Sequence, residues 1–301
     1  MDLLKKLRKK YGNDVAFLLD DEKLNIESIS TGSINLDNAI GIGGYPRGRI
    51  VEIYGPASSG KTTLALHAVV EAQKEGGMCA YIDAEQSFNK DYAETIGIDF
   101  KKLIFVQPSS AEEGLNICQT ILEDGECELV VIDSIDALTP KIYFKEDSLS
   151  ESNVGVKARI VNKAIRIFAN QLNGTKTCLL LINQVRENIG GYGISEVTPG
   201  GKAILFYSSV RIRTSHKKIS ETQGEIKASV KKNKVGSPYK VAAMKIIYGK
   251  GIDTLEEKIN KLVIDGIIEK KGSWYMYEGE SIGQGMEKVK DWYINKYEKI
   301  N

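Results

Sequence analysis

The chain has 301 residues with 41 Lys or Arg, 40 Asp or Glu and 2 His, which gives a formal net charge of +1 at pH 7. That balance argues against a protein that holds a polyanion by net charge alone, and 42% hydrophobic with 27% charged residues is typical of a soluble globular fold. The four cysteines form no C-x-x-C pair, which argues against a zinc site or a disulfide framework. The sequence has no long apolar run and no signal-peptide pattern, which argues against a membrane or secreted protein. We therefore expect a cytoplasmic protein.

The N-terminal residues 3–10 are expected to form a short basic helix with Leu3, Leu4 and Leu7 on one side. A helix of this length is marginal alone, so it should dock on something. Its own domain, a neighbouring subunit or an anionic membrane could provide the surface. A patch at 15–19 and a glycine-rich turn at 41–48 then lead to the first strand.

Residues 49–63 hold an apolar strand that ends in Gly-x-x-x-x-Gly-Lys-Thr and is followed by a helical pattern, which is the context of a P-loop. The backbone amides of such a loop surround phosphates, Lys61 would reach the terminal phosphates, and the Thr62 hydroxyl would bind Mg²⁺. The expected nucleotide-binding residues here are Gly55, Pro56, Ala57, Ser58, Ser59, Gly60, Lys61, Thr62 and Thr63. The sequence therefore predicts binding of a nucleoside triphosphate.

Further apolar runs alternate with helical patterns, which predicts a parallel sheet covered on both faces. The later runs alternate apolar with polar residues and predict antiparallel additions to that sheet. The apolar runs are 78–82, 103–106, 129–134 and 177–182, the helices 111–123 and 155–171, and the later strands 210–213, 226–235 and 241–247. A small terminal unit follows, with a helix at 254–265, a hairpin through 274–277 and a helix at 286–300.

Three of these strands end in a polar residue, and the carboxyl ends of strands in an open α/β sheet face the ligand. Asp133 is the expected Mg²⁺ carboxylate, with a helix cap as the alternative. Glu85 could orient or deprotonate the attacking water, or be a surface residue. Gln184 could sense the γ-phosphate and move the glycine-rich loop that follows, or merely end its strand.

The region 202–250 carries twelve Lys or Arg residues against two Glu, which favours an anionic partner. In the helix 155–171, the spacing of Arg159, Asn162 and Arg166 puts them on one face, either as a phosphate-binding ridge or as a solvated surface. Lys232 and Lys234 lie two apart on an expected strand and point the same way, towards an anion or as lysines that protect a sheet edge.

Taken together, these motifs resemble the RecA/RadA family of recombinases from about residue 10 almost to the C-terminus. The stretches that carry the resemblance are 29–33, 48–56, 58–63, 82–85, 133–134, 137–141, 182–184, 206–207, 209–211, 232–234 and 282–285. Many ATPases share the P-loop, whereas the whole set is specific to this family.

The resemblance implies an α/β fold with three parts: an oligomerisation segment (1–32) with a short helix, a RecA-like P-loop ATPase core (33–250), and a small C-terminal α/β domain (251–301). The core would have a mostly parallel sheet with antiparallel additions and helices on both faces. The implied function is ATP-dependent homologous pairing and strand exchange, with DNA-stimulated ATP hydrolysis, in helical filaments on single-stranded DNA. Duplex DNA is the second nucleic-acid partner, and ATP and Mg²⁺ are the implied cofactors.

The resemblance also implies roles for individual residues. Tyr92 would stack on adenine, Glu85 would be the base, and Gln184 would couple the γ-phosphate to a DNA loop at 185–201. Lys232 and Lys234 would complete the catalytic group with Lys61 by reaching the ATP of the adjacent subunit, and Phe206 would lie in that interface. A second DNA loop would be 145–155. The implied DNA-binding residues are Arg159, Asn162, Arg166, Arg186, Ile189, Gly190, Tyr192, Gly200, Gly201 and Lys202.

The chain departs from the family pattern in its charges. Arg186 is the sole basic residue of the loop 185–201, which is one residue shorter than the family's, and Lys145 faces three acidic residues in the loop 145–155. We therefore expect main-chain N–H groups to carry more of the phosphate contact. The small domain holds eight Lys against ten Asp or Glu, and the family's acidic C-terminal tail has no counterpart.

Two other functions compete with recombination. One is a RecA-fold ATPase without strand exchange, such as a ring motor or signalling ATPase, and the other is a DNA-coating protein that ATP only gates. Phe206, Lys232 and Lys234, together with residues 1–32, favour a filament over a ring, and Glu85 favours an enzyme.

Overall fold

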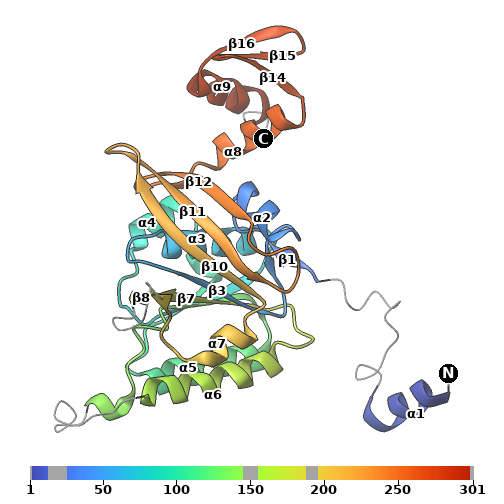
Figure 1. The fold of residues 1–301 in the computed structure, drawn as a ribbon, viewed down its shortest axis with the longest axis vertical. Coiled ribbons are helices and arrows are strands. Elements are labelled where there is room, and N and C mark those ends of the chain that lie inside the picture. Colours follow the sequence, from blue (N-terminus) through green and yellow to red (C-terminus); the bar gives the residue numbers. More distant parts are fainter. Residues whose placement is uncertain (1, 13–25, 145–154, 188–195, 299–301) are drawn as a thin grey trace.

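The fold is organised around one nine-stranded sheet in the order β13-β12-β11-β10-β3-β7-β6-β4-β5, seen in a computed structural model that describes residues 2–12, 26–144, 155–187 and 196–298 (Figure 1). Its strands are β3 (Ile50–Gly55), β4 (Met78–Asp83), β5 (Leu103–Val106), β6 (Cys127–Asp133), β7 (Cys178–Gln184), β10 (Val210–Lys218), β11 (Gln223–Asn233), β12 (Val241–Ile247) and β13 (Gly251–Ile252). The predicted α/β class with a mostly parallel sheet is confirmed.

One half of the sheet is parallel and the other is antiparallel. The strands β10, β3, β7, β6, β4 and β5 pair in parallel, whereas β10 to β13 pair in antiparallel fashion. The expectation that every strand after residue 209 is an antiparallel addition was wrong for β10. The helix α7 (Lys202–Tyr207) crosses over between β7 and β10, so β10 returns in the direction of β3.

Helices cover both faces of the sheet (Figure 1). On one face lie α2 (Ile34–Ile40), α3 (Lys61–Lys74) and α4 (Lys90–Ile96), and on the other α5 (Ala111–Asp124), α6 (Val156–Gln171) and α7. Short elements fill the connections, namely β1 (Ser28–Ile29), β2 (Tyr45–Pro46), β8 (Arg186–Glu187), β9 (Glu196–Val197) and the 3-10 helices Phe100–Lys102 and Lys141–Phe144. All four cysteines are buried and free.

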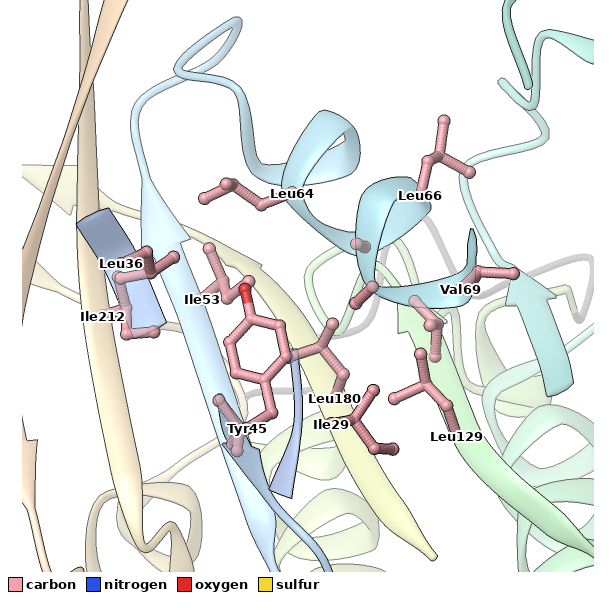
Figure 2. Packing of buried hydrophobic residues seen from close by; sticks show 14 of the residues in the cluster. Ile29, Leu36, Tyr45, Ile53, Leu64, Leu66, Val69, Leu129, Leu180 and Ile212 are labelled. Atoms are coloured by element: carbon pink, nitrogen blue, oxygen red, sulfur yellow. The ribbon is translucent and has the colours of Figure 1, made fainter. Parts of the chain in front are cut away.

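The P-loop helix α3 is held by a dense apolar core. Figure 2 shows Leu64 and Val69 of α3 above strand residues that include Ile53 and Leu180. The ring of Tyr45 is fully buried in the same cluster, and its hydroxyl finds no hydrogen-bond partner among the described residues. The helix that opens on the P-loop therefore rests on a rigid base.

The N-terminal helix α1 (Asp2–Tyr11) lies apart from the core (Figure 1). Leu3 is 70% exposed and Leu7 is 37% exposed, so the predicted apolar side of this helix is not covered by the described part of the chain. In the described residues, no helix is long and apolar enough to cross a membrane.

The C-terminal unit has its own small core of Ile259, Ile268, Tyr275 and Val289. It consists of α8 (Thr254–Ile264), the antiparallel sheet β14 (Ile268–Lys271), β15 (Trp274–Tyr277) and β16 (Glu280–Gln284), α9 (Met286–Tyr293) and a π-helical turn at Ile294–Glu298. The expected hairpin is thus a three-stranded sheet, because Gly279 allows a second turn. The expected helix at 286–300 is α-helical as far as Tyr293 and continues as the π-helical turn to Glu298, the last described residue.

A buried carboxylate joins this unit to the core. Glu257 of α8 accepts a hydrogen bond from the Ser33 hydroxyl at 2.8 Å and faces the N-terminus of α2. Burial raises the pKa of Glu257 to about 7, although the hydrogen bond from Ser33 acts in the opposite direction. The hydrogen bond from Ser33 therefore joins α8 to the start of α2.

Candidate nucleotide site

The P-loop joins β3 to α3 through backbone conformations that favour glycine. Gly60 has φ +90°, and a Cβ atom there would lie 2.2 Å from Ile226 Cδ1. Ser58 also takes a positive φ of 56°. The carbonyl of Thr214 would lie 2.5 Å from a Cβ on Gly55. Only glycine fits at both ends, so the loop can curl tightly enough to direct its N–H groups inward.

A cavity of about 560 Å³ opens over this loop, a size usual for small-molecule sites. Lys61, Thr62, Glu85, Asp133 and Gln184 line one end. The strand ends that we expected to converge on the nucleotide therefore do lie together around the P-loop.

The other end of the cavity includes residues that the sequence reasoning missed. They are His216 on β10 and the stretch 246–249 at the end of β12. The Tyr248 hydroxyl lies 3.2 Å from His216 Nε2, and a Cβ on Gly224 would collide with both side chains. From the sequence we placed only a domain boundary, between residues 250 and 251, next to this stretch.

Tyr92 also lines the cavity, and its hydroxyl lies 3.1 Å from Thr63 Oγ1. Its ring is half-buried, and burial raises the pKa of its hydroxyl. An aromatic face is thus available to a nucleobase.

Two oxygen groups meet at the phosphate end. The Thr62 hydroxyl donates to Asp133 Oδ2 at 2.8 Å, and the buried Tyr81 hydroxyl donates to the same oxygen at 2.6 Å. Burial raises the pKa of Asp133, and these two hydrogen bonds oppose that rise. No group of three or more His, Cys, Asp or Glu able to hold a metal occurs in the described residues. This donor set fits Mg²⁺, which is usually held by one or two protein oxygens with phosphates and water.

Lys61 lies within the loop, where its ammonium donates to the carbonyls of Pro56 at 2.7 Å and Gly55 at 3.2 Å. Burial lowers its pKa, while the charges of Asp133 and Glu85 raise it. Its charge therefore lies at the phosphate end of the cavity.

Glu85 is bridged to the two neighbouring strand ends. Its Oε1 accepts from Ser134 Oγ at 2.7 Å and from Gln184 Nε2 at 3.1 Å. The candidate base and the candidate switch are thus in direct contact.

The candidate DNA-binding residues fall into two groups. Arg159 and Arg166 are exposed on α6, and neither has an ion-pair partner in the part of the chain that the structure describes. Asn162 and Arg186 have partners within the chain. The Asn162 Oδ1 accepts a hydrogen bond from Ala203 N at 2.8 Å, and Arg186 forms an ion pair with Asp136 at 2.6 Å.

Three further candidates, Ile189, Gly190 and Tyr192, lie outside the described residues, as do 145–154. Gly200 and Gly201 both have positive φ and pack against α6, while Lys202 is exposed at the start of α7.

Lys232 and Lys234 both reach the C-terminal end of α7. Each ammonium donates to Phe206 O, at 3.0 Å and 3.1 Å respectively, and Lys232 also donates to Leu205 O. Burial, together with the charges of Lys234 and Arg211, lowers the pKa of Lys232 to about 8. The Phe206 side chain is 67% exposed beside them.

Comparison with known proteins identifies the family to which this chain is similar. The RecA N-terminal domain matches residues 1–253 and the RecA C-terminal domain matches 255–300. Proteins named Protein RecA from Lactobacillus acidophilus and Staphylococcus carnosus are 44% and 43% identical, over 99% of this chain and 83% and 85% of their own. The Protein RecA of Fusobacterium nucleatum is 46% identical over 96% of this chain and 78% of its own. The chain belongs to the RecA family.

Proposed function

We propose that the P-loop cavity binds ATP with Mg²⁺ and hydrolyses it under the control of DNA. Membership of the family makes the chain a DNA-dependent ATPase and an ATP-dependent recombinase, and the proposal assigns that activity to residues. The observation that carries it is the convergence of Glu85, Asp133 and Gln184 on the P-loop cavity.

Within the cavity, Lys61 and the loop amides would bind the phosphates, and Thr62 and Asp133 would hold Mg²⁺. When bound, Mg²⁺ neutralises charge that develops on the transferred phosphoryl group. Glu85 is the candidate to orient and deprotonate the attacking water, since it is the exposed carboxylate next to Gln184. Tyr92 would pack against the adenine ring.

Several exposed apolar side chains support assembly into a filament. Leu3 of α1 and Phe206 of α7 are 70% and 67% exposed, and Ile104 and Phe105 on the edge strand β5 are more than 40% exposed. Exposed apolar groups of this kind, and an open sheet edge, favour contact with another chain. Such a contact would place Lys232 and Lys234 against the ATP of the neighbouring subunit.

Single-stranded DNA would bind along α6 and the adjacent glycine-rich loop. Arg159 and Arg166 support this, because both are exposed, neither forms an ion pair within the described ranges, and phosphates attract arginine guanidinium groups. Duplex DNA is the proposed second partner. We also propose a cytoplasmic location, with which the four free buried cysteines are consistent.

The test is ATP hydrolysis by the full chain with and without single-stranded DNA, alongside negative-stain images. The proposal expects hydrolysis that rises with DNA and helical filaments in the presence of ATP. Hydrolysis that ignores DNA, or closed rings in place of filaments, would contradict it.

A further inference from the structure

A row of polar side chains crosses four neighbouring strands on the face covered by α6 and α7. We call it the polar ladder, and its members are Lys232 on β11, Arg211 on β10, Glu52 on β3 and Asn183 on β7. Lys232 lies opposite Arg211 in the strand register, and Arg211 lies opposite Glu52. Asn183 follows the Glu52 partner Leu181 by two residues, so it shares the same face.

The centre of the polar ladder is a fully buried charge. Glu52 has no exposed surface, and its two oxygens are both occupied: Oε2 accepts from Arg211 Nε at 2.5 Å, and Oε1 accepts from Asn183 Nδ2 at 3.0 Å. A buried carboxylate with two such donors is held tightly, because losing either leaves a charge without its partner. Glu52 therefore fixes the position of the Asn183 side chain.

Asn183 has two further contacts, and they connect both ends of the glycine-rich loop. Its Oδ1 accepts from Gln184 N at 3.1 Å, where the loop begins, and its Nδ2 donates to Pro199 O at 2.9 Å, where the loop returns. Next to Pro199, Gly200 packs against Val161 of α6. One buried amide thus touches the residue proposed to sense the nucleotide and the far end of the loop proposed to bind DNA.

The other end of the polar ladder holds the segment that follows the loop. Lys232 donates to the carbonyls of Leu205 and Phe206 at the end of α7. The segment from Pro199 to Phe206 is therefore held at its start by Asn183 and at its end by Lys232, and the Glu52–Arg211 pair lies between these two residues.

We propose that Asn183 is a positioning residue that transmits a movement of Gln184 to the return end of the DNA loop at Pro199. The inference rests on the proposed function, because it takes Gln184 as the residue that responds to ATP. A shift of the Gln184 backbone must move or release the Asn183 amide, and Glu52 resists movement into the sheet. The Asn183 amide therefore moves towards the loop, and its hydrogen bond to Pro199 O shifts the return end of the loop with it.

The first test is Asn183→Leu, which keeps a similar side-chain size and removes the hydrogen bonds to Glu52, Gln184 N and Pro199 O. The affinity for a single-stranded oligonucleotide is measured with and without a non-hydrolysable ATP analogue, together with the affinity for the analogue itself. Analogue affinity and nucleotide-free DNA affinity should stay within about 2-fold, while the rise in DNA affinity on adding the analogue should fall by at least about 5-fold, since allosteric couplings are typically about 5- to 150-fold.

A second variant protects the test against misfolding. The variant combines Glu52→Leu, Asn183→Leu and Arg211→Leu, so that Glu52 and its two hydrogen-bond partners are removed together and no buried charge loses its partner. Replacing a buried ion pair with apolar residues is often neutral for stability. The matched control is Thr177→Val, just ahead of β7 and far from Asn183 along the strand, which removes a buried hydroxyl that donates to Cys127 O at 2.7 Å. The triple variant should lose the analogue-induced rise, and the control should keep it.

The outcomes separate the two proposals. If the analogue tightens DNA binding in the wild type, Gln184→Ala abolishes this effect, and both Asn183 variants retain it, the role of Asn183 is overturned while the proposed function stands. If the wild-type affinity for DNA does not depend on the analogue, the proposed function itself fails, and the inference fails with it.

Discussion

Gln184 Nε2 donates to Glu85 Oε1 across 3.1 Å, joining the ends of two strands on opposite sides of β6. Glu85 extends from the loop after β4, and Gln184 is the last residue of β7. The residue proposed to activate water thus contacts the residue proposed to sense the γ-phosphate. A movement of either side chain breaks or shifts this hydrogen bond and so affects the position of the other. The bond thus links hydrolysis at Glu85 to the loop that follows Gln184.

The role of Glu85 predicts a loss of turnover without a loss of binding. Glu85→Gln keeps the size of the side chain but removes the base, so ATP hydrolysis should fall by about 10²- to 10⁴-fold. Affinities for ATP and single-stranded DNA should hardly change. Steady-state hydrolysis and equilibrium binding measure both, with Glu126→Gln, an exposed residue ahead of β6, as the control. Near-normal hydrolysis in Glu85→Gln would remove this residue from the mechanism.

The role of Gln184 predicts a different defect. Gln184→Ala should bind ATP normally yet lose the rise in DNA affinity that ATP produces, because the side chain that links the nucleotide to the loop is gone. Fluorescence anisotropy of a labelled oligonucleotide with and without ATP measures the effect. Gln119→Ala on α5 is a matched control, since that amide bonds Glu123 far from the cavity. If ATP still tightens DNA binding, the coupling runs through another residue.

The two exposed arginines of α6 predict a change in salt dependence. Arg159→Ala and Arg166→Ala should each weaken binding to any single-stranded sequence. Each should also lower the slope of log affinity against log salt by about 0.7, the value for one phosphate contact. Titrations at several salt concentrations provide the slope. Lys176→Ala, whose ammonium pairs with Glu27, is the control. A slope that stays at the wild-type value would mean that this face of α6 is only solvated.

The raised pKa of Glu257 predicts how stability depends on pH. The folded chain keeps this proton up to about pH 7, whereas the ordinary value of 4.5 applies on unfolding. Between these values the folded state binds more protons, so its contribution to stability is full below about pH 4.5 and falls as pH rises towards 7, by up to about 1.4 kcal/mol per pH unit. Urea unfolding at pH 5.5, 6.5 and 7.5 should show a weaker pH dependence in Glu257→Gln than in the wild type. Glu269→Gln, on the exposed face of β14, should match the wild type, and equal slopes in all three proteins would contradict the assignment.

The sequence was sufficient to predict the parts of the site that lie on regular elements. The P-loop and the strands that end at Asp133 and Gln184 were predictable, because apolar runs alternate with helices and parallel strands end on one edge. The direction of β10 was not, since it depends on the short crossover helix α7, which has too few residues for a helical period.

Contacts between distant segments were also beyond sequence reasoning. His216 and Tyr248 meet only because β10 and β12 flank β11 and Gly224 leaves room between them. Glu52 is a polar residue in an otherwise apolar strand, and its hydrogen-bond partners, Arg211 and Asn183, come from two other strands. Register and side-chain pairing of this kind follow from the fold and not from local pattern.

We expect each ATP site to be built from two chains of a filament, with Glu85 from one subunit and Lys232 and Lys234 from the next. Two inactive proteins test it: one carries Glu85→Gln, and the other carries both Lys232→Ala and Lys234→Ala. In a filament that the two form at random, about one quarter of the interfaces join an intact Glu85 to intact lysines of the neighbour. A matched mixture of Glu85→Gln with Lys61→Ala should not recover activity, because both changes affect the P-loop side of the site.

The measurement is ATP hydrolysis of these mixtures on single-stranded DNA, in filaments shown to contain both proteins. A shared site should give activity of about one quarter of wild type in the first mixture, only with DNA present, and none in the second. The absence of activity in the first mixture, or equal recovery in both, would contradict a site shared between subunits.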